Sequence, residues 1–246
     1  MKGFIFAAGL GTRLKPITDT LPKALVPVGG RPLIEHVASK LKASGIDEVV
    51  VNVHHFADQV EDWAARQDIL RVDVSDEREQ LLETGGAVLH ARRYLEGCGQ
   101  FLIHNVDILS DVDLKWFESQ VRQDALATLL VSDRKTSRYL LFDPQTMRLV
   151  GWKNENTGEI RPAGAVPDES KCLKFAFSGI HIMSERVFDA MDGYPSRFSV
   201  MDFYLDMCGR YDIYGVCAEN LNLIDVGKLD TLDKAEAFVS SGKTIA

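Results

Sequence analysis

The chain has 246 residues, 46% of them hydrophobic and 26% charged, with a formal net charge of −8. This length and apolar content suit one large α/β domain with a full core, or at most two small domains. The acidic balance argues against a general nucleic-acid-binding surface, which usually needs a basic stripe, although a local basic pocket is enough for a phosphate ligand.

The first half of the sequence alternates strand and helix patterns. Residues 3–8 are an unbroken apolar run, which suits a strand buried on both faces. Residues 9–31 contain so many glycines and prolines that we expect a long ordered loop, which is usually functional in a compact domain. Helices are then predicted over 32–44, 56–67, 84–94 and 113–123, and strands over 47–53, 70–74, 101–104 and 126–131. The alternation predicts a parallel, doubly wound α/β sheet.

The second half is less regular. The pattern predicts a hairpin over 138–142 and 148–152, a polar loop over 153–172, strands over 174–183 and 223–226, and helices near 184–191, 200–208 and 229–240. We see no repeat, low-complexity tract or linker. The sequence therefore predicts a single domain, residues 1–246, in which an antiparallel lobe is inserted over the sheet.

The segment that follows the first strand carries the clearest chemical pattern. Residues 7–14 read Ala-Ala-Gly-Leu-Gly-Thr-Arg-Leu, and they leave the carboxyl end of that strand, where ligands bind in doubly wound sheets. Glycines let backbone N–H groups approach a phosphate chain closely. Arg13 can add bidentate bonds to phosphate, and Lys23 can add a mobile charge. The pattern predicts a phosphate-binding loop.

Other phosphate-binding motifs do not match. The chain lacks the G-x-x-x-x-G-K-[ST] Walker loop. The dinucleotide fingerprint fails because Lys15-Pro16 follow Gly11 where a third glycine and a helix are needed, and because the second strand ends at Asn52 instead of an acidic residue. A tight turn would explain the glycines alone, but not the full pattern of glycines, Thr-Arg, prolines and lysine.

Two aspartates from distant segments are candidate metal ligands. Asp107 follows a buried strand, and Asp225 follows a short apolar strand. Together they would suit a hard cation, which prefers oxygen ligands and keeps several waters. A lone aspartate in such a place is also common as a helix cap or turn residue. Asp202 and Asp206, on one helical face, are the rival pair, and a solvated or structural role suits them better.

The loop resembles the signature of a known family. Gly9-Leu10-Gly11-Thr12-Arg13-Leu14, with Pro22-Lys23-Ala24-Leu25-Val26-Pro27-Val28, is similar to the signature of the sugar-1-phosphate nucleotidyltransferases, and the resemblance runs to Asp225-Val226-Gly227. It implies a Rossmann-like, mostly parallel mixed sheet with a small antiparallel sugar-binding lobe. It also implies Mg²⁺ as cofactor, held by Asp107 and Asp225, and Arg13 and Lys23 as the catalytic pair.

The resemblance also assigns the substrate contacts. A nucleoside triphosphate and a sugar 1-phosphate would be the ligands. The implied nucleotide-binding residues are Ala7, Ala8, Gly9, Gly11, Thr12, Gly85 and Gly86. The implied sugar-binding residues are Glu83, Asn105, Lys153, Ser178 and Gly179.

Residues 83–86 begin a helix, and their free N–H groups and glycines would suit close approach by a base or sugar, although they also suit a capping segment. The Glu-Thr-Gly-Gly form is most similar to that of N-acetylmuramate 1-phosphate uridylyltransferases, followed by mannose-1-phosphate guanylyltransferases. We therefore expect UTP and N-acetylmuramate 1-phosphate as substrates. The alternatives are GTP with mannose 1-phosphate or another hexose or heptose 1-phosphate, and a non-catalytic regulator that binds nucleotide sugars.

Three segments leave the sugar contacts open. Val106 replaces the glycine of the family's usual Gly-Asp pair. Lys153 stands in Gly-Trp-Lys-Asn where the family often has Glu-Lys-Pro, so a solvated lysine is an alternative to a sugar-phosphate contact. Gly179 follows Ser178 in a predicted strand, where a glycine can equally mark a bulge.

Cysteine spacing and the apolar runs bear on location. The four cysteines form no C-x-x-C pair and no zinc pattern, which favours free thiols in a reducing compartment. No run approaches the ~20 apolar residues of a membrane span. We expect a cytoplasmic monomer or dimer that binds neither nucleic acid nor membrane. Within the domain we expect a nucleotide-binding half (1–110), a sugar-binding half (111–228) and a C-terminal helix (229–241).

Overall fold

The structure is a computed structural model that describes residues 1–162 and 168–242. The strands are β1 (Lys2–Phe6), β2 (Pro27–Val28), β3 (Arg31–Pro32), β4 (Glu48–Val53), β5 (Arg71–Asp76), β6 (Gln100–Asn105), β7 (Ile108–Ser110), β8 (Ala127–Ser132), β9 (Arg138–Phe142), β10 (Leu149–Asn154), β11 (Ile160–Arg161), β12 (Leu173–Ser184), β13 (Ile213–Cys217) and β14 (Leu223–Asp225). The α-helices are α1 (Leu33–Ala43), α2 (Ala57–Arg66), α3 (Glu83–His90), α4 (Arg92–Leu95), α5 (Leu114–Ser119), α6 (Val187–Ala190), α7 (Val200–Met207) and α8 (Leu232–Ser240). The 3₁₀ turns are η1 (Thr12–Leu14), η2 (Ile17–Asp19), η3 (Lys23–Leu25), η4 (Glu169–Lys171) and η5 (Leu229–Thr231).

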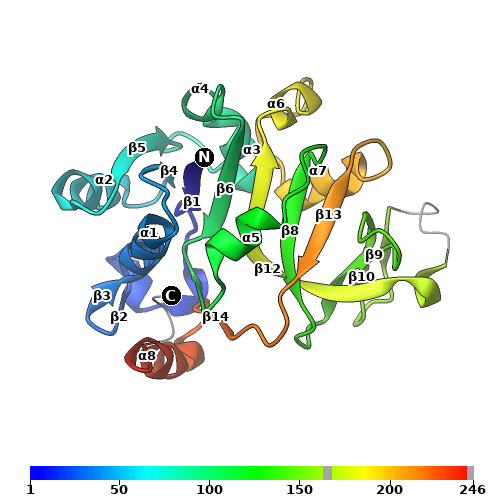
Figure 1. Cartoon of the computed structure of the whole chain (residues 1–246). Helices are drawn as coiled ribbons and strands as arrows, with labels where there is room; N and C mark the ends of the chain where they lie inside the picture. The colour runs from blue at the N-terminus through cyan, green and yellow to red at the C-terminus, as the bar shows by residue number, and fades with distance from the viewer. Residues whose placement is uncertain (163–167, 243–246) are drawn as a thin grey trace.

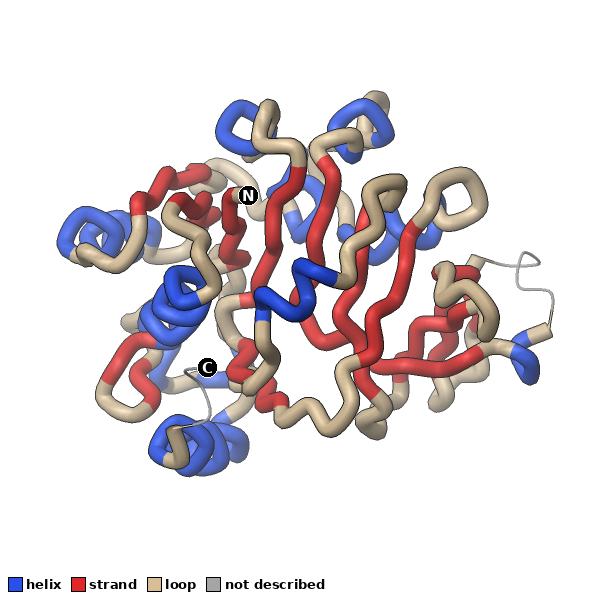
Figure 2. The backbone as a smooth tube through the Cα atoms, viewed as in Figure 1, coloured by secondary structure: helices blue, strands red, loops and turns tan. Residues whose placement is uncertain are grey.

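One mixed sheet runs through the molecule (Figure 1). Strands β5, β4, β1 and β6 are parallel neighbours. The long strand β12 lies antiparallel between β6 and β8, and β13 is parallel to β8. At its amino-terminal end β12 also pairs with β9, which continues through β10 to β11 as an antiparallel lobe at the right of Figure 2. The predicted mostly parallel mixed sheet with a small antiparallel lobe is confirmed.

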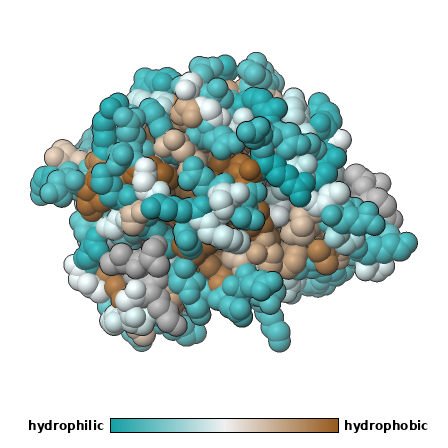
Figure 3. Space-filling view, viewed as in Figure 1, coloured by the Kyte–Doolittle hydropathy of each residue, from teal (hydrophilic) through white to brown (hydrophobic). Residues whose placement is uncertain are grey.

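Helices cover both faces of the sheet, and a separate apolar core lies on each face. Along β1, Ile5 packs in one core with residues of α1, α2 and α5, whereas its neighbour Phe4 packs in the other core with residues of α3, α6 and α7. Alternate side chains of a strand point to opposite faces, so an unbroken apolar run is needed to fill both cores. In the view of Figure 3, polar side chains cover most of the surface.

Several predicted elements differ from the structure. The predicted helix 84–94 is two helices, α3 and α4, and the predicted helix 113–123 ends at Ser119. The loop 9–31 contains three 3₁₀ turns and the short pair β2–β3. The predicted loop 153–172 holds the end of β10, β11 and η4, and its residues 163–167 lie outside the described residues.

Strand β13 was missed because a glycine interrupts its pattern. A β-carbon on Gly215 would lie 2.6 Å from the ring of Phe142, so only glycine fits beside this ring. Glycine in a strand weakens the sequence signal and often marks a close approach. Strand β7 was missed because three residues are too few to show a period.

Parallel strands bring distant segments to one edge of the sheet. Strands β1, β4, β6 and β8 run in the same direction, so the residues that follow them meet at the same carboxyl edge. The small β7–β14 sheet lies there, with Asp225 opposite Ile108. Helix α8 packs beside β2 near this edge, where Glu236 Oε2 accepts a 2.7 Å hydrogen bond from the Gly29 N–H.

Within the described residues, no helix is long and apolar enough to cross a membrane.

Two buried histidines lie on the adjacent strands β6 and β12. Burial lowers the pKa of His104 to about 4 and that of His181 to about 3. The His181 ring is fully enclosed, stacks edge-on against Phe177, and hydrogen-bonds through Nδ1 with the hydroxyl of Tyr204. Both rings are therefore neutral in the folded protein at moderately acidic pH.

His181→Met is expected to reduce the acid sensitivity of folding. Because the pKa of His181 is depressed in the folded state, the unfolded chain binds an extra proton as the pH falls below 6.5. Stability is thus lost with decreasing pH, by about 1.4 kcal/mol per pH unit for such a group. The free energy of unfolding, measured with urea between about pH 4.5 and 6.5, should therefore depend less steeply on pH in the variant, by about this amount per pH unit. The exposed His55 offers the control His55→Gln, and equal slopes in all three proteins would contradict the prediction.

Candidate active site

A cavity of about 390 Å³ opens at the carboxyl edge of the sheet. Its walls come from the ends of β1, β4 and β6, from η3, from the start of α3 with the loop before it, and from the residue before α7. The residues that line it are Phe6, Ala8, Gly9, Lys23, Asn52, Leu81, Glu83, Thr84, Asn105, Val106, Asp107 and Ser199. The structure thus brings together Ala8, Gly9, Lys23, Glu83, Asn105 and Asp107 of the predicted site.

The glycine loop folds back so that Lys23 reaches this cavity. Gly11 has φ +62°, which favours glycine, and a β-carbon there would lie 2.9 Å from Thr18 Cγ2 and 3.1 Å from Lys23 Cβ. The Thr18 hydroxyl donates a 2.8 Å hydrogen bond to the Gly11 carbonyl. Thr12 and Arg13 form the exposed side of η1. A β-carbon on Gly9 would meet nothing within 4 Å, so the chain there lies open to a ligand.

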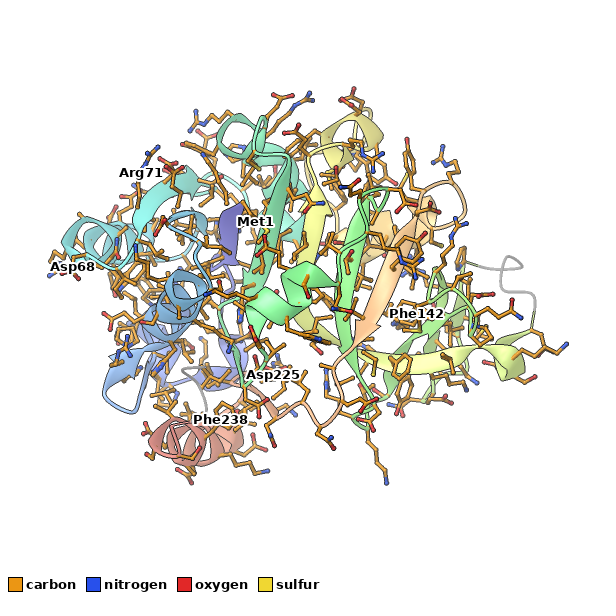
Figure 4. The ribbon with its side chains drawn as sticks, viewed as in Figure 1. Met1, Asp68, Arg71, Phe142, Asp225 and Phe238 are labelled. Atoms are coloured by element: carbon orange, nitrogen blue, oxygen red, sulfur yellow. The ribbon has the colours of Figure 1, made fainter. Side chains whose placement is uncertain are left out.

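Lys23 and Asp107 line the cavity, and Asp225 lies close to both of them. The buried ammonium of Lys23 forms an ion pair with Asp107 Oδ2. The β7–β14 pairing brings Asp225 beside this pair, and the Val226 N–H donates a 2.8 Å bond to the Asp107 carbonyl. Figure 4 shows Asp225 at the end of β14 below β6.

The charges around Asp225 oppose one another. Asp225 is exposed, yet partial desolvation by the surrounding atoms raises the pKa of its carboxyl, and the negative charge of Asp107 raises it further. The positive charges of Lys23, Arg13 and Arg134 lower the pKa of this carboxyl. A β-carbon on Gly227 would lie 2.7 Å from Asp225 Oδ1 and 3.0 Å from Arg13 Nη2. Gly227 therefore leaves room for the carboxylate and the guanidinium to approach one another.

The start of α3 is built differently from the prediction. The N–H groups of Gly85 and Gly86 donate to the Phe198 carbonyl, at 2.9 and 3.1 Å. A β-carbon on Gly85 would overlap the Phe198 ring, and one on Gly86 would overlap the Ser196 carbonyl oxygen. The expectation that these N–H groups are free for a ligand is wrong, because both glycines accommodate the segment 196–199. Neither lines the cavity, whereas Glu83 and Thr84 do.

Glu83 and Thr84 are held by the same segment. Glu83 adopts φ +63°, which is unusual for a residue other than glycine, and its carboxylate pairs with Arg197 at 3.1 Å. The Thr84 hydroxyl accepts a 2.9 Å hydrogen bond from the Val200 N–H at the start of α7. A backbone held in this region by its surroundings is typical of functional sites.

Gly86→Ala is expected to lower the free energy of unfolding by about 2–4 kcal/mol, because the methyl group would displace the 196–199 segment. Urea denaturation measures the effect. Gly209→Ala is the matched control, since a β-carbon on Gly209 meets nothing within 4 Å, and a change within about 0.5 kcal/mol is expected there. If Gly86→Ala were as stable as the control, this packing account would be wrong.

Asn52 and Glu77 form a buried bridge that sequence reasoning missed. Asn52 Oδ1 accepts a 2.8 Å bond from the Ala7 N–H, and its Nδ2 donates a 2.9 Å bond to Glu77 Oε1. Burial raises the pKa of Glu77, although the bond from Asn52 lowers it. Glu77 Oε2 also accepts from the Leu82 N–H at 3.3 Å. The bridge therefore connects the glycine loop to the start of α3, and its sequence signal was a polar residue in an apolar strand.

The remaining predicted residues lie outside the cavity lining. Lys153 pairs with Glu169 at 2.7 Å and with Glu155 at 3.6 Å, so its charge is already matched inside the lobe. Ser178 is buried, with no partner for its hydroxyl within the described residues. Gly179 has φ +75° at the β12 bulge, and a β-carbon there would lie 2.9 Å from Asn105 Nδ2.

The rival carboxylates have structural partners. Asp202 accepts a 2.8 Å bond from Arg161, and Asp206 accepts a 3.2 Å bond from the Tyr194 hydroxyl. Neither lines the cavity. Asp107 and Asp225 are the pair that the fold brings together.

The fold and the site together define a class of protein. A glycine loop, Lys23 and Asp107 line a cavity at the carboxyl edge of a doubly wound sheet, with Arg13 and Asp225 close by, as in α/β enzymes that bind phosphorylated ligands. The family model for nucleotidyl transferases matches residues 2–242, so this chain belongs to the nucleotidyl transferase family. The resemblance to sugar-1-phosphate nucleotidyltransferases drawn from the sequence is confirmed.

Named relatives agree with this family. The N-acetylmuramate α-1-phosphate uridylyltransferase of Caulobacter vibrioides is 32% identical over 224 residues, which are 88% of this chain and 88% of the relative. Mannose-1-phosphate guanylyltransferase 1 of Arabidopsis thaliana is 35% identical over 120 residues, 47% of this chain and 33% of the relative.

Solved structures share the fold over almost the whole chain. HddC from Yersinia pseudotuberculosis, complexed with GMP-PN, matches with a TM-score of 0.73 and 24% identity, covering 97% of this chain and 99% of that one. The inositol-1-phosphate CTP transferase from T. maritima matches with a TM-score of 0.76 and 14% identity, covering 98% and 96%. These likenesses establish the fold.

Proposed function

We propose that this protein transfers a uridylyl group from UTP to N-acetylmuramate 1-phosphate, giving the nucleoside diphosphate sugar and pyrophosphate. The observation that carries the reaction type is that Lys23 and Asp107, which line the cavity, lie close to Asp225 and Arg13, which come from outside its lining. Simple binding of a nucleotide sugar does not require a second carboxylate beside the first.

The cations would bind the triphosphate. Arg13 lies exposed on η1 and has no carboxylate within ion-pair distance in the described part of the chain, so its guanidinium can form bidentate bonds with phosphate. Lys23 lines the cavity and would stabilise the charge that develops at the α-phosphorus. The backbone of the loop would also contact the phosphates, through residues Ala7, Ala8, Gly9, Gly11 and Thr12.

The carboxylates fit a magnesium ion. Desolvation and mutual repulsion raise the pKa of Asp225 beside Asp107, and a bound cation would relieve that repulsion. No group of three or more His, Cys, Asp or Glu converges among residues 1–162 and 168–242. Two carboxylates suit Mg²⁺, which keeps several waters and shares substrate phosphates. When bound, Mg²⁺ would neutralise charge on the reacting phosphates.

The transfer needs no covalent intermediate with the protein. A phosphate oxygen of the sugar 1-phosphate attacks the α-phosphorus of the triphosphate, a new P–O bond forms, and the bond to the leaving pyrophosphate breaks. Arg13 and Lys23 would hold the triphosphate in line for this attack, and the walls formed by Glu83, Thr84 and Asn105 would orient the base and the sugar.

The substrate pair is supported by the Caulobacter relative, which extends over most of this chain and carries that activity in its name. GTP with mannose 1-phosphate is the second candidate, supported by the shorter match to the Arabidopsis enzyme. A regulator that binds nucleotide sugars without catalysis is the different kind of function to exclude.

A matrix of initial rates tests the proposal. UTP, GTP, dTTP, CTP and ATP are each combined with the 1-phosphates of N-acetylmuramate, mannose, glucose and heptose, and pyrophosphate release is measured with Mg²⁺ present. The proposal expects the highest kcat/KM for UTP with N-acetylmuramate 1-phosphate. A maximum for GTP with mannose 1-phosphate would support the second candidate. Bound ligand without pyrophosphate from any pair would indicate the regulator.

A further inference from the structure

Arg134 is an exposed cation that sequence reasoning did not single out. It lies two residues beyond β8, whose carboxyl end meets the same sheet edge as those of β1, β4 and β6. Its Nη2 donates a 2.9 Å hydrogen bond to the Phe177 carbonyl in β12. That bond places the guanidinium at the junction between the main sheet and the antiparallel lobe.

The same stretch of β12 faces the cavity wall. Phe177 lies two residues before Gly179, where an added β-carbon would lie 2.9 Å from Asn105 Nδ2, and Asn105 lines the cavity. Arg134 also lies close enough to Asp225 for their charges to interact. Arg134 therefore lies near the carboxylates, on the side of the cavity that leads to the lobe.

The charge of Arg134 is available to a ligand. No carboxylate lies within ion-pair distance of its guanidinium in the described ranges, which omit 163–167 and 243–246. The hydrogen bond to the Phe177 carbonyl uses one of the five N–H donors of the guanidinium and restrains this planar group. Several donors therefore remain for a phosphate group. Restraint of a side chain before binding reduces the entropy lost when the ligand arrives.

The ammonium of Lys153 is already paired with Glu169 and Glu155, so Lys153 would have to break these ion pairs to bind a phosphate. Arg13 and Lys23 lie with the glycine loop and would serve the triphosphate. The second anionic substrate therefore needs a cation that approaches from the lobe. Resting on the proposed function, we propose that Arg134 binds the phosphate group of the sugar 1-phosphate and aligns it for attack.

Arg134→Gln tests this role in steady-state kinetics with the full chain. The KM for sugar 1-phosphate is expected to rise about 10- to 100-fold, the usual effect of losing a hydrogen-bonded ionic contact, whereas the KM for the triphosphate stays within about twofold. Arg134→Lys keeps the positive charge but lacks the planar guanidinium, and its KM for sugar 1-phosphate should rise less. Lys135→Gln removes the neighbouring exposed lysine and should leave both KM values unchanged.

The outcomes separate this inference from the proposed function. A wild type that releases no pyrophosphate with any pair contradicts the proposed function, and this inference with it. An active wild type whose Arg134→Gln variant has an unchanged KM for sugar 1-phosphate, or a raised KM for the triphosphate instead, overturns the role of Arg134 alone. A KM rise limited to N-acetylmuramate 1-phosphate among the accepted sugars would also overturn it, because Arg134 would then contact the lactyl carboxylate. Thermal unfolding shows whether loss of the Phe177 bond alone explains the effect.

Discussion

Lys23→Ala is expected to lower kcat by about 1,000-fold, the largest effect that we predict for a single substitution. Lys23 is the cation that lines the cavity and pairs with Asp107, so its loss removes the positive charge where charge develops in the transition state. The KM for the triphosphate should change much less, because Arg13 and the loop backbone still bind the phosphates. Pyrophosphate release under saturating substrates gives both values.

The variant should still fold, because Lys23 contributes one ion pair to a large apolar core. Circular dichroism and thermal unfolding establish this before kinetics are interpreted. Lys42→Ala serves as the control, since Lys42 pairs with Asp47 on the surface of α1 and should keep the wild-type rate. A Lys23→Ala enzyme within about threefold of the wild-type kcat would remove Lys23 from the catalytic machinery.

Asp225→Asn is expected to lower activity at least about 100-fold while leaving thermal stability equal or higher. The amide keeps the size of the side chain, but it removes the charge that a divalent cation needs and relieves the repulsion by Asp107. The requirement for Mg²⁺ should also shift to higher concentrations. Rates across a Mg²⁺ titration and thermal unfolding together test these opposite effects.

Asp202→Asn is the matched control from the rival pair. It removes the charge that pairs with Arg161 but should keep both the rate and the Mg²⁺ requirement. Chelation of Mg²⁺ with EDTA should abolish the wild-type activity, and added Mg²⁺ should restore it. Full activity of Asp225→Asn at low Mg²⁺ would exclude Asp225 as a metal ligand.

The parts of the fold that depend on local patterns were predictable. The apolar run of β1 and the alternation through β8 predicted a doubly wound sheet, which the structure confirms. Strand β13 was not predictable, because the glycine at position 215 is required by its contact with the Phe142 ring, which is distant in sequence. The predicted division into nucleotide-binding and sugar-binding halves stays a prediction.

The site was predictable where one segment carries several functional groups. The loop with Gly11, Arg13 and Lys23 has a dense pattern, and the structure folds it onto the cavity. The roles of Gly85 and Gly86 depend on a segment more than a hundred residues later, which local sequence does not reveal. Lys153 was placed by motif position, and only the structure shows its bond to Glu169.

We propose above all that this protein transfers a nucleotidyl group to a sugar 1-phosphate bound in the cavity. Phosphorus NMR of the wild-type protein with UTP, N-acetylmuramate 1-phosphate and Mg²⁺ tests it most directly. We expect the signals of a diphosphate sugar and of pyrophosphate to grow in equal amounts while both substrates decline together. Unchanged substrate signals, or hydrolysis of UTP without a diphosphate sugar, would contradict it.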